Sequence, residues 1–193
     1  MQIVCRRKKT FEPLIRAKLS QHHISTPAIQ YGTRHESTAV SNYVQHKQEE
    51  ISLKFVVEDS GLIINVAKPW LAASPDGTVD DPTAGCGLLE VKCPYKCRNK
   101  SFAEAVKDST FFLTHKDEMF KLKVSHQYYY QVQFQLYVSE FEWCDFVVWS
   151  PKELYIEGFA AMLTFSIHQS SINFTHSTLT IYCQRYSQSR SAL

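Results

Sequence analysis

Residues 87–94, Gly-Leu-Leu-Glu-Val-Lys-Cys-Pro, constrain this chain more than any other stretch. They read as a short buried strand, and Pro94 ends it because proline cannot donate to a β-ladder. Side chains alternate between the two faces of a strand. We therefore expect one face with Leu89 and Val91 and another with Leu88, Glu90 and Lys92. The charged pair needs a partner or a metal ion, since isolated charges are costly to bury.

A turn signal lies upstream of this strand, at Ser74-Pro75-Asp76-Gly77. Proline presets φ, aspartate bonds its own backbone, and glycine accepts positive φ. Two carboxylates, Asp76 and Glu90, can hold a hard divalent cation, normally Mg²⁺, for which Mn²⁺ can substitute. Lys92 can then orient or help deprotonate a metal-bound water that attacks phosphorus. The alternative interpretation is a surface turn followed by an ion pair on an edge strand.

Four motifs together resemble the YqaJ/lambda-exonuclease group of the PD-(D/E)xK nucleases. The first two are the turn at residues 74–77 and the strand at residues 89–94. Residues 31–36, Tyr-Gly-Thr-Arg-His-Glu, resemble that group's Gly-x-x-x-Glu on an early helix. Residues 130–136, Tyr-Gln-Val-Gln-Phe-Gln-Leu, resemble its later Gln-x-Gln helix. The motifs follow the family's order between about residues 27 and 150.

The resemblance implies an α/β fold with a restriction-endonuclease-like core, in which helices flank a small mixed β-sheet. It also implies the reaction: metal-dependent hydrolysis of DNA phosphodiester bonds by a 5′-3′ exonuclease acting on linear duplex DNA in recombination. Related enzymes form rings, which makes a homo-oligomer one expectation. The residues implied in the site are Asp76, Glu90 and the Val91 carbonyl as metal ligands, Lys92 beside the attacking water and Gln131 beside the lysine or the phosphate. Glu36 is implied as a further metal-site carboxylate, which faces the metal through water or binds a second metal ion.

Two alternatives to an exonuclease stay open. One is a structure-selective endonuclease, and the other is a catalytically inactive DNA-binding module that keeps the nuclease fold. The chain also departs from the family at both ends. No residue near the N-terminus can be matched to the family's arginine that contacts the DNA 5′ phosphate. After the last expected hairpin, a tail rich in Ser, Thr and Gln stands where the family has a helix.

Helical periodicity predicts four helices, at residues 11–20, 28–46, 101–108 and 125–139. Ser101 and Glu104 form a capping box for the third helix, and Ser125 can cap the fourth. In the fourth helix a row of glutamines recurs every four residues, at Gln127, Gln131 and Gln135. We expect the first and last on an exposed face and Gln131 in the site, and we leave the role of Gln133 open.

The remaining segments are expected to form the sheet and its loops. The strand pattern predicts a hairpin formed by residues 53–58 and 62–67, with a third strand near 69–74. Residues 78–86 predict a loop in which Asp80 and Asp81 are solvated rather than metal ligands. Residues 143–149 and 153–159 predict a second hairpin that completes the sheet.

The formal net charge of +2 is too small to indicate nucleic-acid binding, so a local basic patch must supply it. Lys96, Arg98 and Lys100 follow the central strand directly and are candidates for phosphate contacts. A solvated basic loop is the alternative for each of them. We expect double-stranded DNA as the partner.

The length of 193 residues suits one domain with a core. We predict a basic N-terminal segment at 1–26, the nuclease core at 27–160 and a divergent tail at 161–193. No apolar run approaches a membrane span, which predicts a soluble intracellular protein without a membrane partner. Cys93-x-x-x-Cys97 could suggest zinc, but no second closely spaced Cys/His pair completes a structural site, and reduced thiols are the favoured interpretation.

Overall fold

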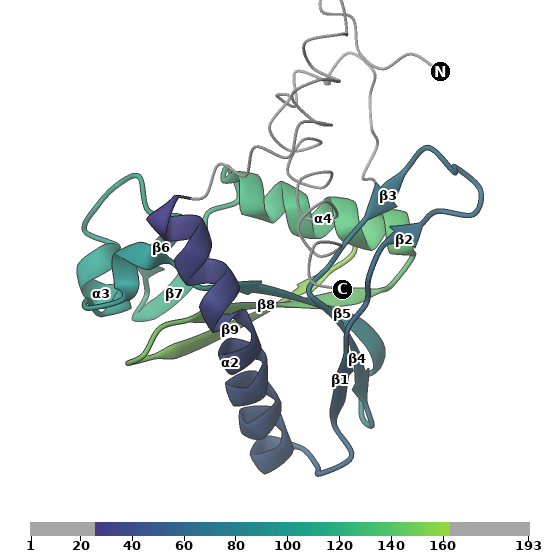
Figure 1. The fold of residues 1–193 in the computed structure, drawn as a ribbon, viewed down its shortest axis with the longest axis horizontal. Coiled ribbons are helices and arrows are strands. Elements are labelled where there is room, and N and C mark those ends of the chain that lie inside the picture. The colour runs from purple at the N-terminus through teal and green to yellow at the C-terminus, as the bar shows by residue number, and fades with distance from the viewer. Residues whose placement is uncertain (1–25, 163–193) are drawn as a thin grey trace, which may run out of the picture.

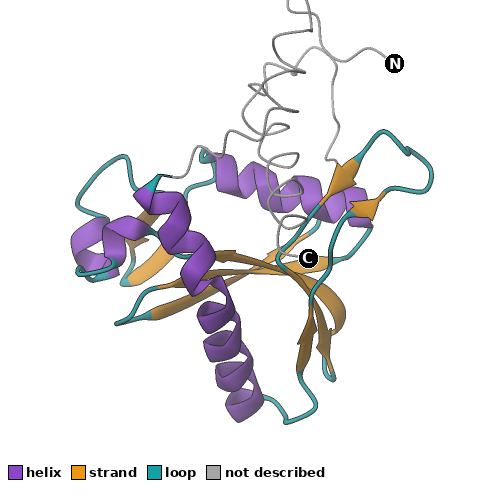
Figure 2. Cartoon of the chain, in the orientation of Figure 1, coloured by secondary structure: helices purple, strands orange, loops and turns teal. Residues whose placement is uncertain are grey.

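The computed structural model describes residues 26–162, which form a mixed five-stranded sheet with helices on both faces (Figures 1 and 2). The strands are, in sheet order, β1 (Val56–Glu58), β4 (Gly77–Asp81), β5 (Gly85–Lys92), β8 (Trp143–Trp149) and β9 (Leu154–Ala160). Only β5 and β8 pair in parallel, and the other neighbours are antiparallel. This confirms the predicted α/β fold class with a small mixed sheet.

Two long helices cover opposite faces of the sheet. Helix α2 (Pro27–Glu50) packs on the face that carries Leu89 and Val91, through a cluster that includes Ala39 and Tyr43. Helix α4 (Gln127–Ser139) packs on the other face, where its apolar residues join Leu88 and Phe146 in a second cluster. The predicted alternation along β5 is therefore confirmed. None of the helices within residues 26–162 is long and apolar enough to cross a membrane.

The connection from β5 to β8 carries a lobe before it reaches α4, and this lobe packs into the same core cluster as α4. Its elements are η1 (Tyr95–Cys97), α3 (Phe102–Ala105), β6 (Leu113–Lys116) and β7 (Met119–Leu122). The capping box is confirmed, because the Ser101 hydroxyl accepts from the Glu104 amide and Glu104 bonds back to the Ser101 N–H. The cap of α4 is His126 rather than Ser125, since the His126 ring accepts a hydrogen bond from the Tyr128 N–H.

The hairpin predicted for residues 53–58 and 62–67 is wrong. Strand β1 pairs with β4, while β2 (Ile63–Ile64) pairs with β3 (Ala72–Ala73) in a sheet of their own. Two side-chain bonds explain the difference. The Ser60 hydroxyl donates to the Pro75 carbonyl over 2.8 Å, and the Ser74 hydroxyl donates to the Gly61 carbonyl over 3.0 Å. They hold residues 60–61 beside residues 74–75, so the chain does not fold back on β1.

The loop predicted for residues 78–86 is also wrong, because β4 occupies Gly77–Asp81. Val79 is buried while Asp80 is exposed, as strand alternation requires. Asp81 is not solvated: its Oδ1 accepts from the backbone N–H groups of Thr83 and Ala84 at 2.7 and 3.1 Å and closes the turn into β5. Burial raises the pKa of Asp81, but these hydrogen bonds outweigh it and the pKa lies below its usual value.

The predictions for the ends of the chain concern residues outside the described range. They are the helix at 11–20, most of the basic segment at 1–26 and the tail beyond residue 162. The division into a basic segment, a core and a tail stays a prediction. The predicted helix at 28–46 and the hairpin at 143–149 and 153–159 are confirmed by α2 and by the antiparallel pair β8 and β9.

A buried hydrogen bond fixes α2 on the sheet. The hydroxyl of the fully buried Tyr43 donates to Asp145 Oδ2 of β8 over 2.7 Å, and Lys47 Nζ lies 3.2 Å from the same oxygen. Tyr43 and Lys47 are one helical turn apart, so both reach the same carboxylate. The pKa of Tyr43 is raised far above its usual value by burial and by Asp145, which keeps the hydroxyl a donor.

We predict that Tyr43→Phe lowers the free energy of unfolding by about 1.5–3 kcal/mol, the usual contribution of a hydrogen bond to a charged group. The ring packing survives this change, so the loss isolates the bond to Asp145. Urea unfolding followed by circular dichroism measures it. Tyr95→Phe, at a partly exposed tyrosine, is the matched control, and an equal loss in both variants would contradict the assignment.

Candidate active site

The site is built around Glu90, a fully buried carboxylate in the middle of β5. Gln131 Nε2 donates to its Oε1 over 2.6 Å, and Gln135 Nε2 donates to its Oε2 over 2.7 Å. Lys92 Nζ also donates to Oε1. Each carboxylate oxygen thus accepts at least one hydrogen bond, which satisfies the requirement for burying a charge.

Helix α4 supplies both amides because Gln131 and Gln135 lie one turn apart on the face that meets β5. Gln127, one turn earlier, is exposed as predicted. The prediction that Gln135 is exposed is wrong, since its side chain is fully buried against Glu90. Gln133 has a different partner: its Nε2 donates to the Ala160 carbonyl and its Oε1 accepts from the Met162 N–H, both over 3.0 Å. It therefore ties α4 to the end of β9.

Lys92 leaves β5 two residues after Glu90, on the same face. Only 11% of its side chain is exposed, and its Nζ lies 4.7 Å from the centre of the Tyr128 ring. Burial lowers the pKa of Lys92, but the charge of Glu90 and further negative groups outweigh it and raise the pKa. Lys92 is therefore a cation at neutral pH.

Asp76 reaches the site from the turn before β4. Its backbone N–H donates to the Leu89 carbonyl over 3.0 Å, and its Oδ2 accepts from the Val91 N–H over 2.7 Å. The predicted turn thus places the carboxylate against the edge of β5 beside the residue that follows Glu90. In a strand the N–H and C=O of one residue point to the same side. The Val91 carbonyl therefore points to the side occupied by Asp76.

Glu36 comes to the same end of β5 from α2. It is partly buried, and its charge raises the pKa values of both Lys92 and Cys93. The preceding residue, His35, stacks on Trp149 of β8 with ring centres 5.2 Å apart, which fixes this turn of α2 over the strand ends. The structure therefore brings the predicted set together around the second half of β5: Glu36, Asp76, Glu90, Val91, Lys92 and Gln131.

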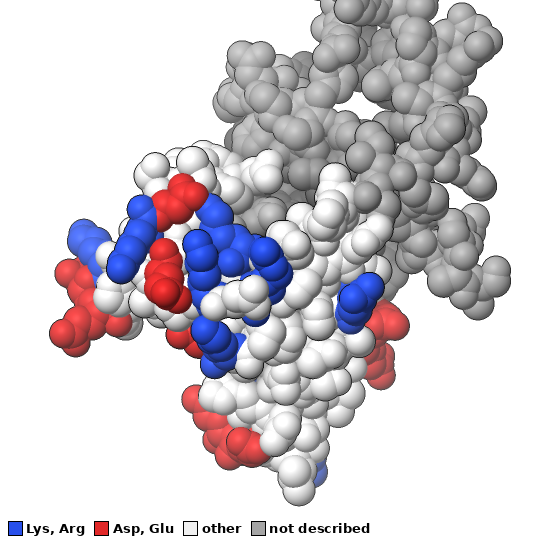
Figure 3. All heavy atoms as spheres, turned by 60° about the vertical axis from the view of Figure 1, so that its left-hand side comes forward, with Lys and Arg blue, Asp and Glu red and all other residues white. Residues whose placement is uncertain are grey.

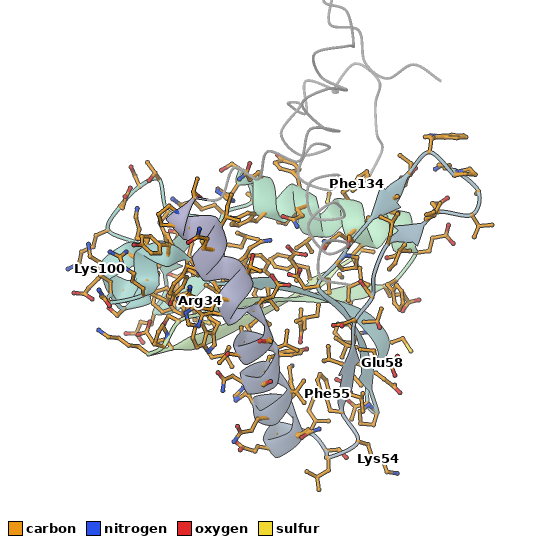
Figure 4. All side chains as sticks on the ribbon, in the orientation of Figure 1. Arg34, Lys54, Phe55, Glu58, Lys100 and Phe134 are labelled. Carbon is orange, nitrogen blue, oxygen red and sulfur yellow. The ribbon has the colours of Figure 1, made fainter. Side chains whose placement is uncertain are left out.

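The three predicted basic residues line an open cavity of about 730 Å³ beside this set. The cavity lies between the N-terminal turn of α2 and the lobe, where Figure 3 shows lysine and arginine side chains gathered. Tyr128, which contacts Lys92, is part of its wall. Lys96 is paired with Asp108, and the Arg98 guanidinium lies 3.9 Å from the Tyr95 ring centre. Lys100 is on the outer side of the lobe (Figure 4).

The donor atoms of the site fit a hard divalent cation. Two carboxylates, Asp76 and Glu90, and one backbone carbonyl, Val91, are the oxygen ligands that Mg²⁺ accepts. Within residues 26–162 no group of three or more His, Cys, Asp or Glu side chains could hold a metal ion. Mg²⁺ does not need such a group, because it is commonly bound by one or two carboxylates together with water and substrate phosphates.

The mixed sheet, the parallel β5–β8 pair and the Asp, Glu-x-Lys set at its centre define a core of the restriction-endonuclease-like type. The sequence model of the YqaJ-like viral recombinase domain family matches residues 4–142, and the chain belongs to this family. The resemblance found in the four sequence motifs is thereby confirmed.

Solved structures with a similar fold include the alkaline exonuclease LHK-Exo from Laribacter hongkongensis. Its crystal structure has 22% identity and a TM-score of 0.51, and the match covers 93% of this chain and 78% of that one. The same enzyme in complex with dAMP gives 22% identity and a TM-score of 0.51, over 94% and 83% of the two chains. At this identity the likeness establishes the fold. Comparison with curated proteins gave no match.

The thiols beside the site are expected to be unreactive. Burial and the charge of Glu36 raise the pKa of Cys93 to about 12, and burial and Glu153 raise that of Cys97 to about 11. The thiolate is the nucleophile, so both residues stay protonated and slow to react at neutral pH.

We predict that iodoacetamide at pH 7.5 modifies the exposed Cys86 well before Cys93 and Cys97. Peptide mapping by mass spectrometry over time measures the three rates. Urea-unfolded protein is the control, in which Cys93 and Cys97 gain most in rate. Fast labelling of both thiols in the folded protein would contradict the prediction.

Proposed function

We propose that this chain is a metal-dependent deoxyribonuclease, a 5′-3′ exonuclease that acts on linear duplex DNA in recombination. The observation that carries the proposal is the convergence of Asp76, Glu90 and Lys92 at β5 in a chain of the YqaJ-like viral recombinase family. The exonuclease named LHK-Exo shares the fold and supports the choice of reaction.

The proposed cofactor is Mg²⁺, with Mn²⁺ as a substitute, held by Asp76, Glu90 and the Val91 carbonyl. When bound, the cation supplies positive charge to the scissile phosphate and acidifies water. Glu36 adds a further carboxylate at the same end of β5. The hydrogen bond from the Val91 N–H to Asp76 fixes one ligand, and the two amides of α4 fix the other.

The proposed role of Lys92 is to orient or activate the attacking water, which an ammonium does by stabilising the negative charge that develops there. Its ammonium is anchored to Glu90 and lies near the Tyr128 ring, so it is preorganised at the site. Gln131 supports this arrangement through Glu90, because its amide and Lys92 share the same carboxylate oxygen.

The proposed DNA path crosses the cavity beside Lys92. Lys96, Arg98 and Lys100 line it and can contact phosphates, which position a duplex without reading its sequence. The aromatic walls, including Tyr95 and Phe112, offer apolar surface to sugars and bases. A homo-oligomer, as in ring-forming relatives, belongs to the same proposal.

The structure-selective endonuclease and the inactive DNA-binding module stay as alternatives. The buried Glu90 argues against the inactive module. Burying its charge costs desolvation and needs Gln131, Gln135 and Lys92 to satisfy it, whereas apolar residues of similar volume would fill the same space without that cost.

The proposed exonuclease activity can be tested by comparing end-labelled linear DNA with closed circular DNA in the presence of Mg²⁺. An exonuclease degrades the linear DNA and leaves the circle intact. Lys92→Ala should lower the rate by about 10²–10³-fold, the usual contribution of a positioned group that stabilises developing charge. Lys54→Ala, at an exposed lysine beyond α2, should keep full activity and serves as the matched control (Figure 4).

Cleavage of both substrates would establish the endonuclease alternative. Binding without cleavage, with Mg²⁺ and with Mn²⁺, would establish the inactive module. Full activity of Lys92→Ala would remove Lys92 from the mechanism.

The proposed binding of a divalent cation can be tested by its effect on thermal stability. A ligand that binds only the folded state stabilises it, by about 2.7 kcal/mol at 100 times its Kd. Mn²⁺ should therefore raise the Tm by several degrees, and Asp76→Asn should abolish the rise because it removes a ligand charge. Asp80→Asn, at an exposed aspartate of β4, should keep it. Differential scanning calorimetry with and without Mn²⁺ measures the effect, and an unchanged response in Asp76→Asn would refute the ligand set.

A further inference from the structure

Gln135 is a buried partner of Glu90 to which the sequence motifs assign no role. It lies on α4 one turn beyond Gln131, its side chain is fully buried, and its Nε2 donates to Glu90 Oε2 over 2.7 Å. Gln131 donates to the other oxygen, Oε1, over 2.6 Å. The carboxylate is thus held at both oxygens by two amides from a single helix.

The oxygen of the Gln135 amide, Oε1, indicates the role of this residue. Its Oε1 is buried and has no hydrogen-bond partner within the described part of the chain. An unsatisfied buried acceptor costs free energy that methionine or leucine, of similar size, would avoid. Turning the amide round would place Oε1 against a carboxylate oxygen, which is repulsive. A glutamine at this position therefore lowers the stability of the fold, and what it provides in exchange is the hydrogen bond that its Nε2 donates to Glu90.

The helix that carries the two amides is itself anchored next to them. Gln133 donates to the Ala160 carbonyl and accepts from the Met162 N–H, which ties α4 to the end of β9. Two donors on one anchored helix can restrain both the position and the plane of the carboxylate, whereas a single donor leaves it free to rotate. A metal ligand needs this restraint more than a structural ion pair does.

We infer that Gln135 is a positioning residue that holds the Glu90 carboxylate in the orientation in which it receives the divalent cation. The inference rests on the proposed function, since it requires Glu90 to be a metal ligand. Hydrogen-bond partners of metal ligands commonly contribute about 10–100-fold to metal affinity. Gln135 should therefore affect binding of the cation and leave binding of DNA unchanged.

The test uses the full chain and Mn²⁺ alone, with isothermal titration calorimetry and the spin-resonance signal of bound Mn²⁺ as readouts. Gln135→Met keeps the size of the side chain and removes both the donor and the unsatisfied oxygen. It should weaken Mn²⁺ binding at least tenfold and change the spectrum of the bound ion. Gln127→Met, in the same row of the helix but exposed, should match wild type in both readouts.

A kinetic measurement separates positioning from a general loss of structure. In Gln135→Met the Mn²⁺ concentration for half-maximal cleavage should rise at least tenfold, while the KM for DNA stays at the wild-type value. Gln135→Asn keeps the amide but is too short to reach Glu90, and it should show the same loss. It replaces the methionine variant if that variant fails to fold.

The outcomes distinguish the two proposals. If wild type binds no Mn²⁺, the metal-dependent function fails and the inference fails with it. If wild type binds Mn²⁺ and a folded Gln135 variant binds it equally well with an unchanged spectrum, the inference alone is overturned. A rise in the KM for DNA equal to the rise in the Mn²⁺ requirement would also overturn it, because the residue would then act on the structure as a whole.

Discussion

The structure depends on the burial of one carboxylate, Glu90, at the centre of its sheet. A charge in that position is tolerated only when strong donors surround it. Lys92 and two amides of α4 meet that requirement. The same bonds decide where α4 lies and which of its faces meets the sheet. The chemistry of the site and the packing of half of the core are therefore set by a single requirement.

The opposite face of the sheet repeats this arrangement with other residues. There Asp145, on the strand next to β5, accepts from Tyr43 and pairs with Lys47, both on α2. One buried carboxylate thus anchors each long helix. The first carboxylate belongs to the proposed site, while the second accepts from Tyr43 and pairs with Lys47 on α2, the helix that also carries Glu36. A structural ion pair on one face supports the geometry of the candidate site on the other.

The sequence predicted the parts of the fold that depend on local rules. Alternation along β5 placed Glu90 and Lys92 on one face, and capping chemistry placed α3. The burial of Gln135 was not predicted, because residues four apart on a helix are rotated by about 40° around its axis. The glutamine row therefore turns from solvent at Gln127 to the sheet at Gln135, and only packing fixes which residue of the row faces the sheet. Strand β4 was not predicted because its polar residues resemble those of a turn. Its strand character depends on pairing with β1 on one side and β5 on the other.

The parallel pairing of β5 with β8 has a consequence for how the chain folds. Antiparallel neighbours can form soon after they are synthesised, but β8 reaches β5 only after the whole lobe and α4 have been made. Closing so long a connection costs chain entropy before any contact repays it, which slows folding. During synthesis β5 therefore keeps one unpaired edge, and Glu90 lacks the two amides of α4. The nascent chain is most prone to aggregation in this interval, and it ends only when the proposed catalytic centre is assembled.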